Sequence, residues 1–154
     1  MPQYKTHLAG GLFAFVGAVL LFSLHAKSSH VLIEWALWCL LGSLFPDIDI
    51  KSKGQQVWYP LLLVLTLLMV MHKAWMMVGL LVFLGLTSTV VRHRGMFHNL
   101  WFVAAACCAF SFLSHLYSPA FAHLVAYDCA FFFIGVASHV ALDLGPRRMW
   151  FMRW

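Results

Sequence analysis

Charged side chains are scarce in this sequence. Asp, Glu, Lys and Arg together make up 10% of its 154 residues, and only five of them are acidic. A soluble domain carries about a quarter charged residues, so this chain has too few to cover a surface that faces water. Hydrophobic residues make up 63% of the chain. We therefore expect lipid to be the solvent for much of it.

The sequence also lacks a C-x-x-C pair of cysteines, long linkers, repeats and low-complexity segments. Its cysteines lie inside apolar stretches, and none forms the C-x-x-C spacing of a zinc knuckle; they are Cys39, Cys107, Cys108 and Cys129. We interpret them as small buried apolar residues and not as a disulfide framework. Residues 1–154 are predicted to form a single membrane-embedded domain.

Apolar stretches separated by short breaks follow one another along the chain. The stretches are Leu8–Leu24, Val31–Pro46, Val57–Met71, Ala74–Val91, Asn99–Leu116 and Leu124–Leu144. Unpaired backbone groups are too costly in lipid, and the alternating pattern of a barrel strand is absent, so each stretch is predicted to be helical. Several are shorter than the ~20 residues that cross a bilayer core. We expect an all-α, polytopic integral membrane helical bundle with about four to six membrane-embedded helices.

The first apolar stretch and the basic residues bear on topology. The stretch after Lys5 resembles a secretory signal, but its length favours a retained first span. When the breaks are assigned to alternating sides, eight of the ten Lys and Arg residues share one side with both termini, Asp47–Gln56 and Arg92–His98. Positive residues in short loops mark the cytoplasmic side. We predict a multi-pass protein of the bacterial inner membrane with both termini cytoplasmic, and no nucleic-acid partner.

Residues that could ligate a metal ion gather on that same side. They are His7, Asp47, Asp49, His93, His98, His139 and Asp143. Imidazole nitrogen and carboxylate oxygen suit zinc and similar divalent ions. His139 and Asp143 are four residues apart and therefore share one face of a helix. The alternative for this pair is a hydrogen bond at a helix end, but ionisable groups in an apolar span are costly and favour function.

Two aspartates flank a single residue directly after Pro46. Proline followed by aspartate ends one helix, and aspartate can cap the next, so a helix cap is the simple alternative here. As metal ligands, Asp47 and Asp49 could bridge or share ions. One of them could instead accept a proton from water while the other ligates.

The break Arg92–His98 combines histidines with arginines around Gly95, which lets the backbone bend. A basic loop that grips anionic lipid would explain the arginines but not His93 and His98. Arginine beside a metal site suits phosphate, because its fork binds oxyanions in pairs. We therefore assign Arg94 to the candidate catalytic residues, together with Asp47 and Asp49.

The remaining ionisable residues lie nearer the opposite side or within spans. We interpret the histidines among them as interfacial; they are His25, His30, His72, His115 and His123. Glu34 and Asp128 are intramembrane acids, for which we favour hydrogen bonds between helices.

These motifs, in their order along the chain, resemble the YdjM-like family of inner-membrane metal-dependent hydrolases. The matching segments are Thr6-His7 with Gly10-Gly11, Gly42–Asp49, His93–His98 and Ser138–Asp143. The chain departs from the family pattern at Phe97 and Asn99, where threonine and serine are frequent. It departs again after Asp143, where Leu144–Arg148 replaces a threonine-glycine stretch.

The order of the ligand candidates is also similar, more remotely, to that of zinc-dependent phospholipase C and the related single-strand-specific zinc nucleases. That likeness implies one to three clustered ions, zinc first with manganese or iron as alternatives, and phosphoester cleavage. The N-terminal tryptophan ligand of those enzymes has no counterpart here. We expect a membrane-bound metal-dependent hydrolase, phosphoesterase or phospholipase C-like, that acts at the cytoplasmic face on a lipid or lipid-linked phosphate or another membrane-near substrate.

Two other functions compete with this expectation. One is a non-enzymatic membrane protein with a structural metal site that docks a soluble partner on its basic face. The other is a metal transporter, which is disfavoured because transporters place polar residues along a path near the bilayer midplane. The oligomeric state stays open, since Gly10-Gly11 and Gly79 with Gly85 could serve helix packing within or between chains.

Overall fold

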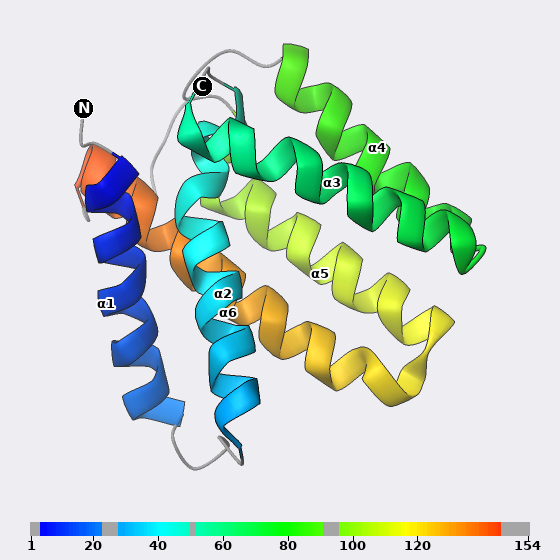
Figure 1. The fold of residues 1–154 in the computed structure, drawn as a ribbon, viewed down its shortest axis with the longest axis horizontal. Coiled ribbons are helices and arrows are strands. Elements are labelled where there is room, and N and C mark those ends of the chain that lie inside the picture. The colour runs from blue at the N-terminus through cyan, green and yellow to red at the C-terminus, as the bar shows by residue number, and fades with distance from the viewer. Residues whose placement is uncertain (1–3, 23–27, 50–51, 91–95, 146–154) are drawn as a thin grey trace.

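The structure, a computed structural model, describes residues 4–22, 28–49, 52–90 and 96–145. These residues form six α-helices and two short 3₁₀ helices, without a strand (Figure 1). The elements are α1 (Tyr4–Phe22), α2 (Ser29–Leu44), η2 (Phe45–Asp49), α3 (Lys53–Met71), α4 (Trp75–Val90), η3 (Met96–His98), α5 (Leu100–Tyr117) and α6 (Pro119–Leu144). The predicted all-α fold is confirmed.

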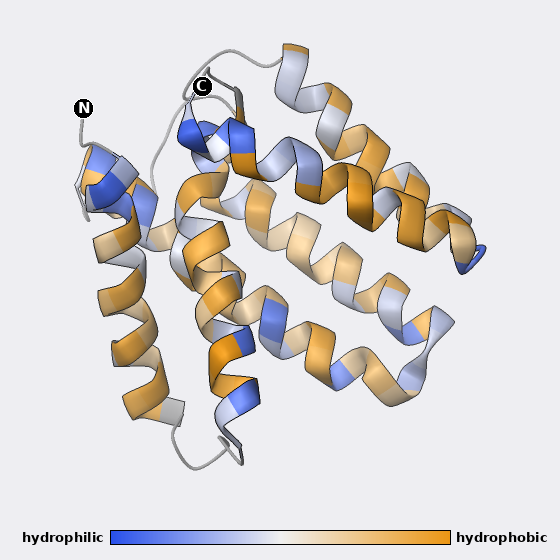
Figure 2. Ribbon diagram, viewed as in Figure 1, coloured by the Kyte–Doolittle hydropathy of each residue, from blue (hydrophilic) through white to orange (hydrophobic). Residues whose placement is uncertain are grey.

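Most of these helices have the length and composition of membrane spans. α1, α2, α3, α5 and α6 are each long and apolar enough to cross a bilayer, and α4 is a shorter apolar helix of 16 residues. Large apolar side chains point outward, with Phe13 81% and Leu21 82% exposed. Figure 2 shows hydrophobic colouring along the helices, with most hydrophilic residues near helix ends. The predicted polytopic bundle is therefore confirmed.

Four helices begin earlier than the sequence predicted, among them α1 at Tyr4 and not Leu8, and α2 at Ser29 and not Val31. α3 starts at Lys53 and not at Val57, because Ser52 caps it by accepting a hydrogen bond from the Gln55 N–H at 3.2 Å. α6 starts at Pro119 and not at Leu124. Proline at the first helical position lacks only an N–H that would have no partner inside the helix. The predicted break Tyr117–His123 therefore shrinks to a single residue between α5 and α6.

α6 is the central helix, and it packs against α1, α2 and α5 (Figure 1). Glycines let α2 and α6 meet backbone to backbone. A Cβ atom at Gly42 would collide with the Phe132 carbonyl, and one at Gly135 would collide with the Cys39 carbonyl. Small residues permit such close approach in membranes. This crossing brings the C-terminal turns of α6 next to the end of α2 and the start of α1.

The helices α3 and α4 form an antiparallel pair that packs mainly against each other and against η2. The turn between them places Lys73 at a positive φ of 56°. Because η2 precedes α3 and η3 follows α4, the pair leaves one end of the bundle and returns to it. Asp47 of η2 and His98 of η3 can therefore meet.

Candidate metal centre

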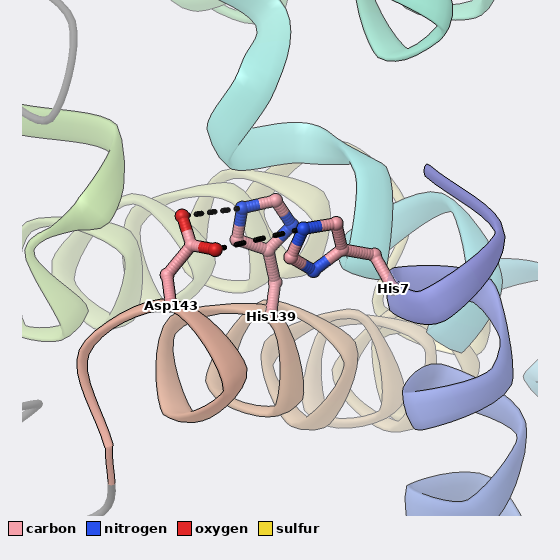
Figure 3. Close-up of side chains that lie close together, drawn as sticks. All are labelled: His7, His139 and Asp143. Carbon is pink, nitrogen blue, oxygen red and sulfur yellow. Dashed lines mark ion pairs between the residues drawn. The ribbon is translucent and has the colours of Figure 1, made fainter. Parts of the chain in front are cut away.

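Ligand candidates from four elements come together at one end of the bundle. His7 lies on α1, Asp47 on η2 and His98 on η3, while His139 and Asp143 lie one turn apart on α6. Figure 3 shows His7, His139 and Asp143, whose polar ends point toward one another. Five of the seven residues predicted from the sequence as ligands thus share one cluster.

The facing nitrogen and oxygen atoms are separated by 3.6 or 3.7 Å. His7 Nε2 lies 3.6 Å from Asp143 Oδ1, and His98 Nε2 lies 3.7 Å from Asp143 Oδ2. His139 Nε2 lies 3.7 Å from Asp143 Oδ2 and 3.6 Å from Asp47 Oδ1. Such gaps exceed the length of a good N–H···O hydrogen bond, about 2.7–3.2 Å. Two ligands of one tetrahedral zinc, each about 2.0–2.1 Å from the ion, lie roughly 3.4 Å apart. The spacing therefore fits a shared cation better than direct hydrogen bonds.

A backbone carbonyl determines the orientation of His139. Its Nδ1 lies 2.7 Å from the Ser43 carbonyl oxygen. A carbonyl can only accept, so Nδ1 carries the proton and Nε2 presents its lone pair to the cluster. Gly11 of α1 packs against Ser43, where an added Cβ would lie 2.8 Å from the Ser43 Cβ. The close packing of α1 against α2 thus supports the residue that orients His139.

The three imidazole rings also pack on one another. The His7 and His139 rings are stacked, with centroids 3.8 Å apart and planes 14° from parallel. The His98 ring meets the His139 ring edge-on at 5.4 Å and 75°. Because each ring limits the rotation of its neighbour, the nitrogen atoms are held in place before any ion binds.

The cluster is almost completely buried. His7 is 2% exposed, His98 and His139 are 0% exposed, and the Asp143 side chain is 4% exposed, whereas the Asp47 side chain is 19% exposed. Within the described part of the chain, His7 Nδ1 and Asp143 Oδ1 have no hydrogen-bond partner. Buried polar atoms without partners are costly. A cation between the ligands would compensate the carboxylate charge.

Two groups in the cluster have the spacing of metal ligands. One consists of His7, His139 and Asp143, and the other of Asp47, His98 and His139; in each group the ligand atoms lie within 4.8 Å of one another. The Asp143 oxygens face different partners, with Oδ1 toward His7 and Oδ2 toward His98 and His139. The donor atoms of either group would suit a divalent ion.

The sequence around Pro46 explains why Asp47 reaches the cluster. Proline has no N–H to continue the helix, and the chain tightens into η2, where the Phe45 N–H bonds to the Gly42 carbonyl. The Trp58 indole N–H of α3 donates to the Leu41 carbonyl at 3.1 Å. These bonds hold the end of α2, so that Asp47 follows directly beyond it.

Phe97 anchors His98, a role that the sequence analysis missed. Phe97 is 1% exposed, and its ring meets the Phe45 ring edge-on at 5.3 Å. On the other side of His98, the Asn99 side chain caps α5 by accepting hydrogen bonds from the Trp101 and Phe102 N–H groups. The only signal in the sequence was that a large apolar residue and a capping residue flank this histidine.

Some predicted site residues are not part of the described cluster. His93 and Arg94 lie outside the described residues, as does the side chain of Asp49. Their assignment to the site stays a prediction.

The other ionisable residues that the structure describes lie away from the cluster. Four histidines are exposed near helix ends, namely His30, His72, His115 and His123. Asp128 Oδ1 on α6 is buried without a hydrogen-bond partner among the described residues, so the bond between helices that we favoured for it stays a prediction. Glu34 is exposed on α2. These residues stand apart from the two groups of candidate ligands.

A bundle of apolar helices with a buried cluster of histidine and aspartate at one end defines a polytopic membrane protein with a candidate metal centre. The chain belongs to the YdjM inner membrane protein family, whose family model matches residues 1–148. No curated protein and no solved structure matches the chain. The family match confirms the resemblance seen in the sequence, whereas the likeness to zinc-dependent phospholipase C stays a prediction.

Proposed function

We propose that this protein is a metal-dependent hydrolase that cleaves a phosphoester of a lipid or membrane-near substrate at the cytoplasmic face of the inner membrane. The observation that carries the proposal is the convergence of three imidazoles and two carboxylates from α1, η2, η3 and α6, with facing atoms 3.6–3.7 Å apart. This donor set suits zinc, and also manganese or iron. Eight positive residues on this side support the cytoplasmic orientation.

The residues of the cluster divide into two ligand sets around Asp143. His7 and Asp143 Oδ1, with His139, would hold an ion at one position, while Asp47, His98 and Asp143 Oδ2, again with His139, would hold an ion at the other. When bound, divalent metal lowers the pKa of a water molecule to about 7 and stabilises the charge on phosphate oxygens. The first set supplies fewer ligands from the described residues and so leaves more coordination positions for water and substrate.

Asp47 and Arg94 have separate roles in this proposal. Asp47 is the most exposed member of the cluster, with a side chain that is 19% exposed. A carboxylate at the accessible edge can ligate and can accept a proton from the attacking water; Asp49 is the alternative base. Arg94 would neutralise phosphate charge through its paired N–H groups.

The surroundings of the cluster favour a substrate that is itself in the bilayer. Leu142, which lies between His139 and Asp143 on α6, is 43% exposed. Trp101, three residues beyond His98, is 67% exposed. An amphiphile diffusing laterally could hold its chain against such apolar surface while its phosphate reaches the ligands. This supports a lipid or lipid-linked phosphate over a soluble phosphoester.

The test begins with the metal content of the detergent-purified protein and of three single variants. Wild type should contain near-stoichiometric zinc, manganese or iron, and Asp47→Ala and His139→Ala should lose it. The control is His123→Ala, which removes an exposed histidine from the same helix as His139. Phosphate or phosphorylated headgroup release is then measured with vesicles that contain phospholipid or isoprenoid phosphate.

The two ligand variants should lose more than about 100-fold in turnover, as expected when an acid–base or metal-binding group is removed. Their thermal unfolding in detergent should stay cooperative. Full turnover by either ligand variant would contradict the proposal, as would a wild type that neither contains nor takes up metal.

A second function is favoured by the burial of the cluster. With His98 and His139 0% exposed, a metal bound there could be structural, and the basic face could dock a soluble partner. A protein that binds metal stoichiometrically, loses thermal stability on chelation and hydrolyses none of the phosphoesters would support this alternative.

A further inference from the structure

Side chains from the first turns of α3 bind the backbone of the segment that carries Asp47. The Ser52 hydroxyl donates to the Asp47 carbonyl at 2.8 Å. The Gln55 side-chain amide donates to the Ile48 carbonyl at 3.3 Å. The carbonyls of Asp47 and its neighbour are therefore both held from α3, which itself contributes no ligand candidate among the residues described.

The sequence of this turn is that of a capping box, but the glutamine is used differently. Ser-x-x-Gln at 52–55 is a pattern in which the glutamine side chain usually turns back toward the N-cap. Ser52 does accept the Gln55 N–H, at 3.2 Å. The Gln55 amide nitrogen, however, reaches outward to Ile48. One half of the motif caps α3, and the other half holds the Asp47 segment.

Gln55 is also the first member of a hydrogen-bonded chain that runs from α3 to α4. Its amide nitrogen lies 3.5 Å from the Tyr59 hydroxyl, and Tyr59 lies 3.2 Å from the Ser88 hydroxyl. Ser88 donates to the Gly85 carbonyl at 2.6 Å. Because the amide can only donate and Ser88 uses its proton on Gly85, the Tyr59 proton must point to Ser88.

The bonds from Gln55 through Tyr59 and Ser88 to the Gly85 carbonyl run in one direction, and a second bond from Gln55, to the Ile48 carbonyl, links this helix pair to the site. Ser88 is 2% exposed, so water does not compete for its hydrogen bonds. Bonds that share a direction polarise and strengthen one another. Hydrogen bonds of this kind between α3 and α4 could simply hold the two helices together. This series, however, ends at the carbonyl of Ile48, the residue that follows Asp47.

We propose that Gln55 is a positioning residue for Asp47, and that Tyr59 and Ser88 hold Gln55 in the conformation that keeps the Asp47 carboxylate beside His139. This inference rests on the proposed metal centre. The described residues of α3 and α4 include no candidate ligand. The inference gives these two helices a role at the centre as its support.

Cobalt binding to the metal-depleted protein tests the proposal without any substrate. Titration followed by the visible absorption of Co²⁺ gives an affinity for each variant. Gln55→Leu should weaken binding about 10-fold, which is typical when a residue supporting a metal ligand is removed. Tyr59→Phe and Ser88→Ala should weaken it in the same direction by a smaller factor, and Ser88→Thr, which keeps the hydroxyl, should restore wild-type affinity.

The matched control is Thr87→Val. Thr87 adjoins Ser88 and makes the same kind of bond, to the carbonyl of Leu84 three residues earlier, at 3.0 Å. It is not a member of the Gln55–Tyr59–Ser88 chain, so its removal should leave cobalt affinity unchanged. Equal losses in Thr87→Val and Ser88→Ala would indicate a general effect on α4 and would overturn the proposal.

A double-mutant cycle separates positioning from a structural role. If Gln55 acts through Asp47, Gln55→Leu should have no further effect on residual cobalt binding once Asp47 is replaced by alanine. Additive losses would overturn the positioning role, and so would unchanged affinity in both Gln55→Leu and Ser88→Ala. A wild type that takes up no cobalt would overturn the metal centre together with this inference. If Gln55→Leu does not fold, the pair Ser88→Ala and Ser88→Thr decides alone.

Discussion

At the level of single residues, the Ser43 carbonyl determines which ring nitrogen of His139 can bind a metal ion. It occupies Nδ1 at 2.7 Å and leaves Nε2 as the single ligand atom, which belongs to both candidate ligand groups. His7 belongs to only one of them. The two histidines are stacked face to face, yet their removal should have unequal consequences.

We predict that His139→Ala removes nearly all bound metal, while His7→Ala removes only part of it, because the group formed by Asp47, His98 and His139 stays complete. Elemental analysis per mole of purified protein measures both. His115→Ala, which removes an exposed histidine of α5, should keep the wild-type content. Equal metal content in the His7 and His139 variants would show that the two groups are not distinct.

At the level of elements, the geometry of the candidate metal centre depends on how closely α2 and α6 cross. Gly42 and Gly135 let the two backbones touch. This contact carries Ser43 to within hydrogen-bond distance of His139 on the next turn of α6. The helices themselves follow from apolar composition, but their separation depends on the absence of side chains at two positions.

Alanine at Gly135 should therefore destabilise the protein by about 1–3 kcal/mol, as overpacking in a core does, and lower its metal content. The control is Gly79→Ala on α4, where a Cβ atom meets nothing within 4 Å. That variant should be as stable as wild type or more so, since alanine is favoured over glycine in helices by about 1 kcal/mol. Thermal unfolding in one detergent compares them. Matching unfolding temperatures for the two variants would contradict the close crossing.

At the level of the whole molecule, the cluster constrains the path of the chain through the membrane. His7 opens α1 and Asp143 lies near the end of α6, and the two are 3.6 Å apart. Asp47 and His98, before α3 and after α4, reach the same place. If the helices cross the bilayer, an even number of crossings is needed to bring all these ends to one side, and we therefore predict that the short helix α4 also crosses.

Because eight of the ten Lys and Arg residues are assigned to this side, we predict that both termini face the cytoplasm. A fluorescent protein fused to the C-terminus should fluoresce, and a phosphatase that is active only outside the cytoplasm should be inactive there. The same phosphatase inserted at the turn His72-Lys73, on the opposite side, should be active. A C-terminal fusion with phosphatase activity would contradict the predicted cytoplasmic side of the C-terminus.

The sequence by itself determined the helices and the set of candidate ligands. Local hydropathy is enough for the helices, because a chain in lipid must pair its own backbone groups. The helix starts were harder to predict. Ser52 caps α3 and Pro119 occupies the first position of α6, and both lie in polar or mixed stretches that hydropathy does not assign to a helix. The same-side placement of His7, Asp47, His98, His139 and Asp143 followed from counting alternating spans.

Only the tertiary structure decided how those residues are held. The bond between His139 and Ser43 joins residues 96 positions apart, and the Phe45–Phe97 and Gln55–Tyr59–Ser88 contacts join separate elements. No local pattern distinguishes a serine whose carbonyl orients a ligand from any other small residue in an apolar helix. Such roles depend on the distance between helices, which is set by packing over the whole bundle.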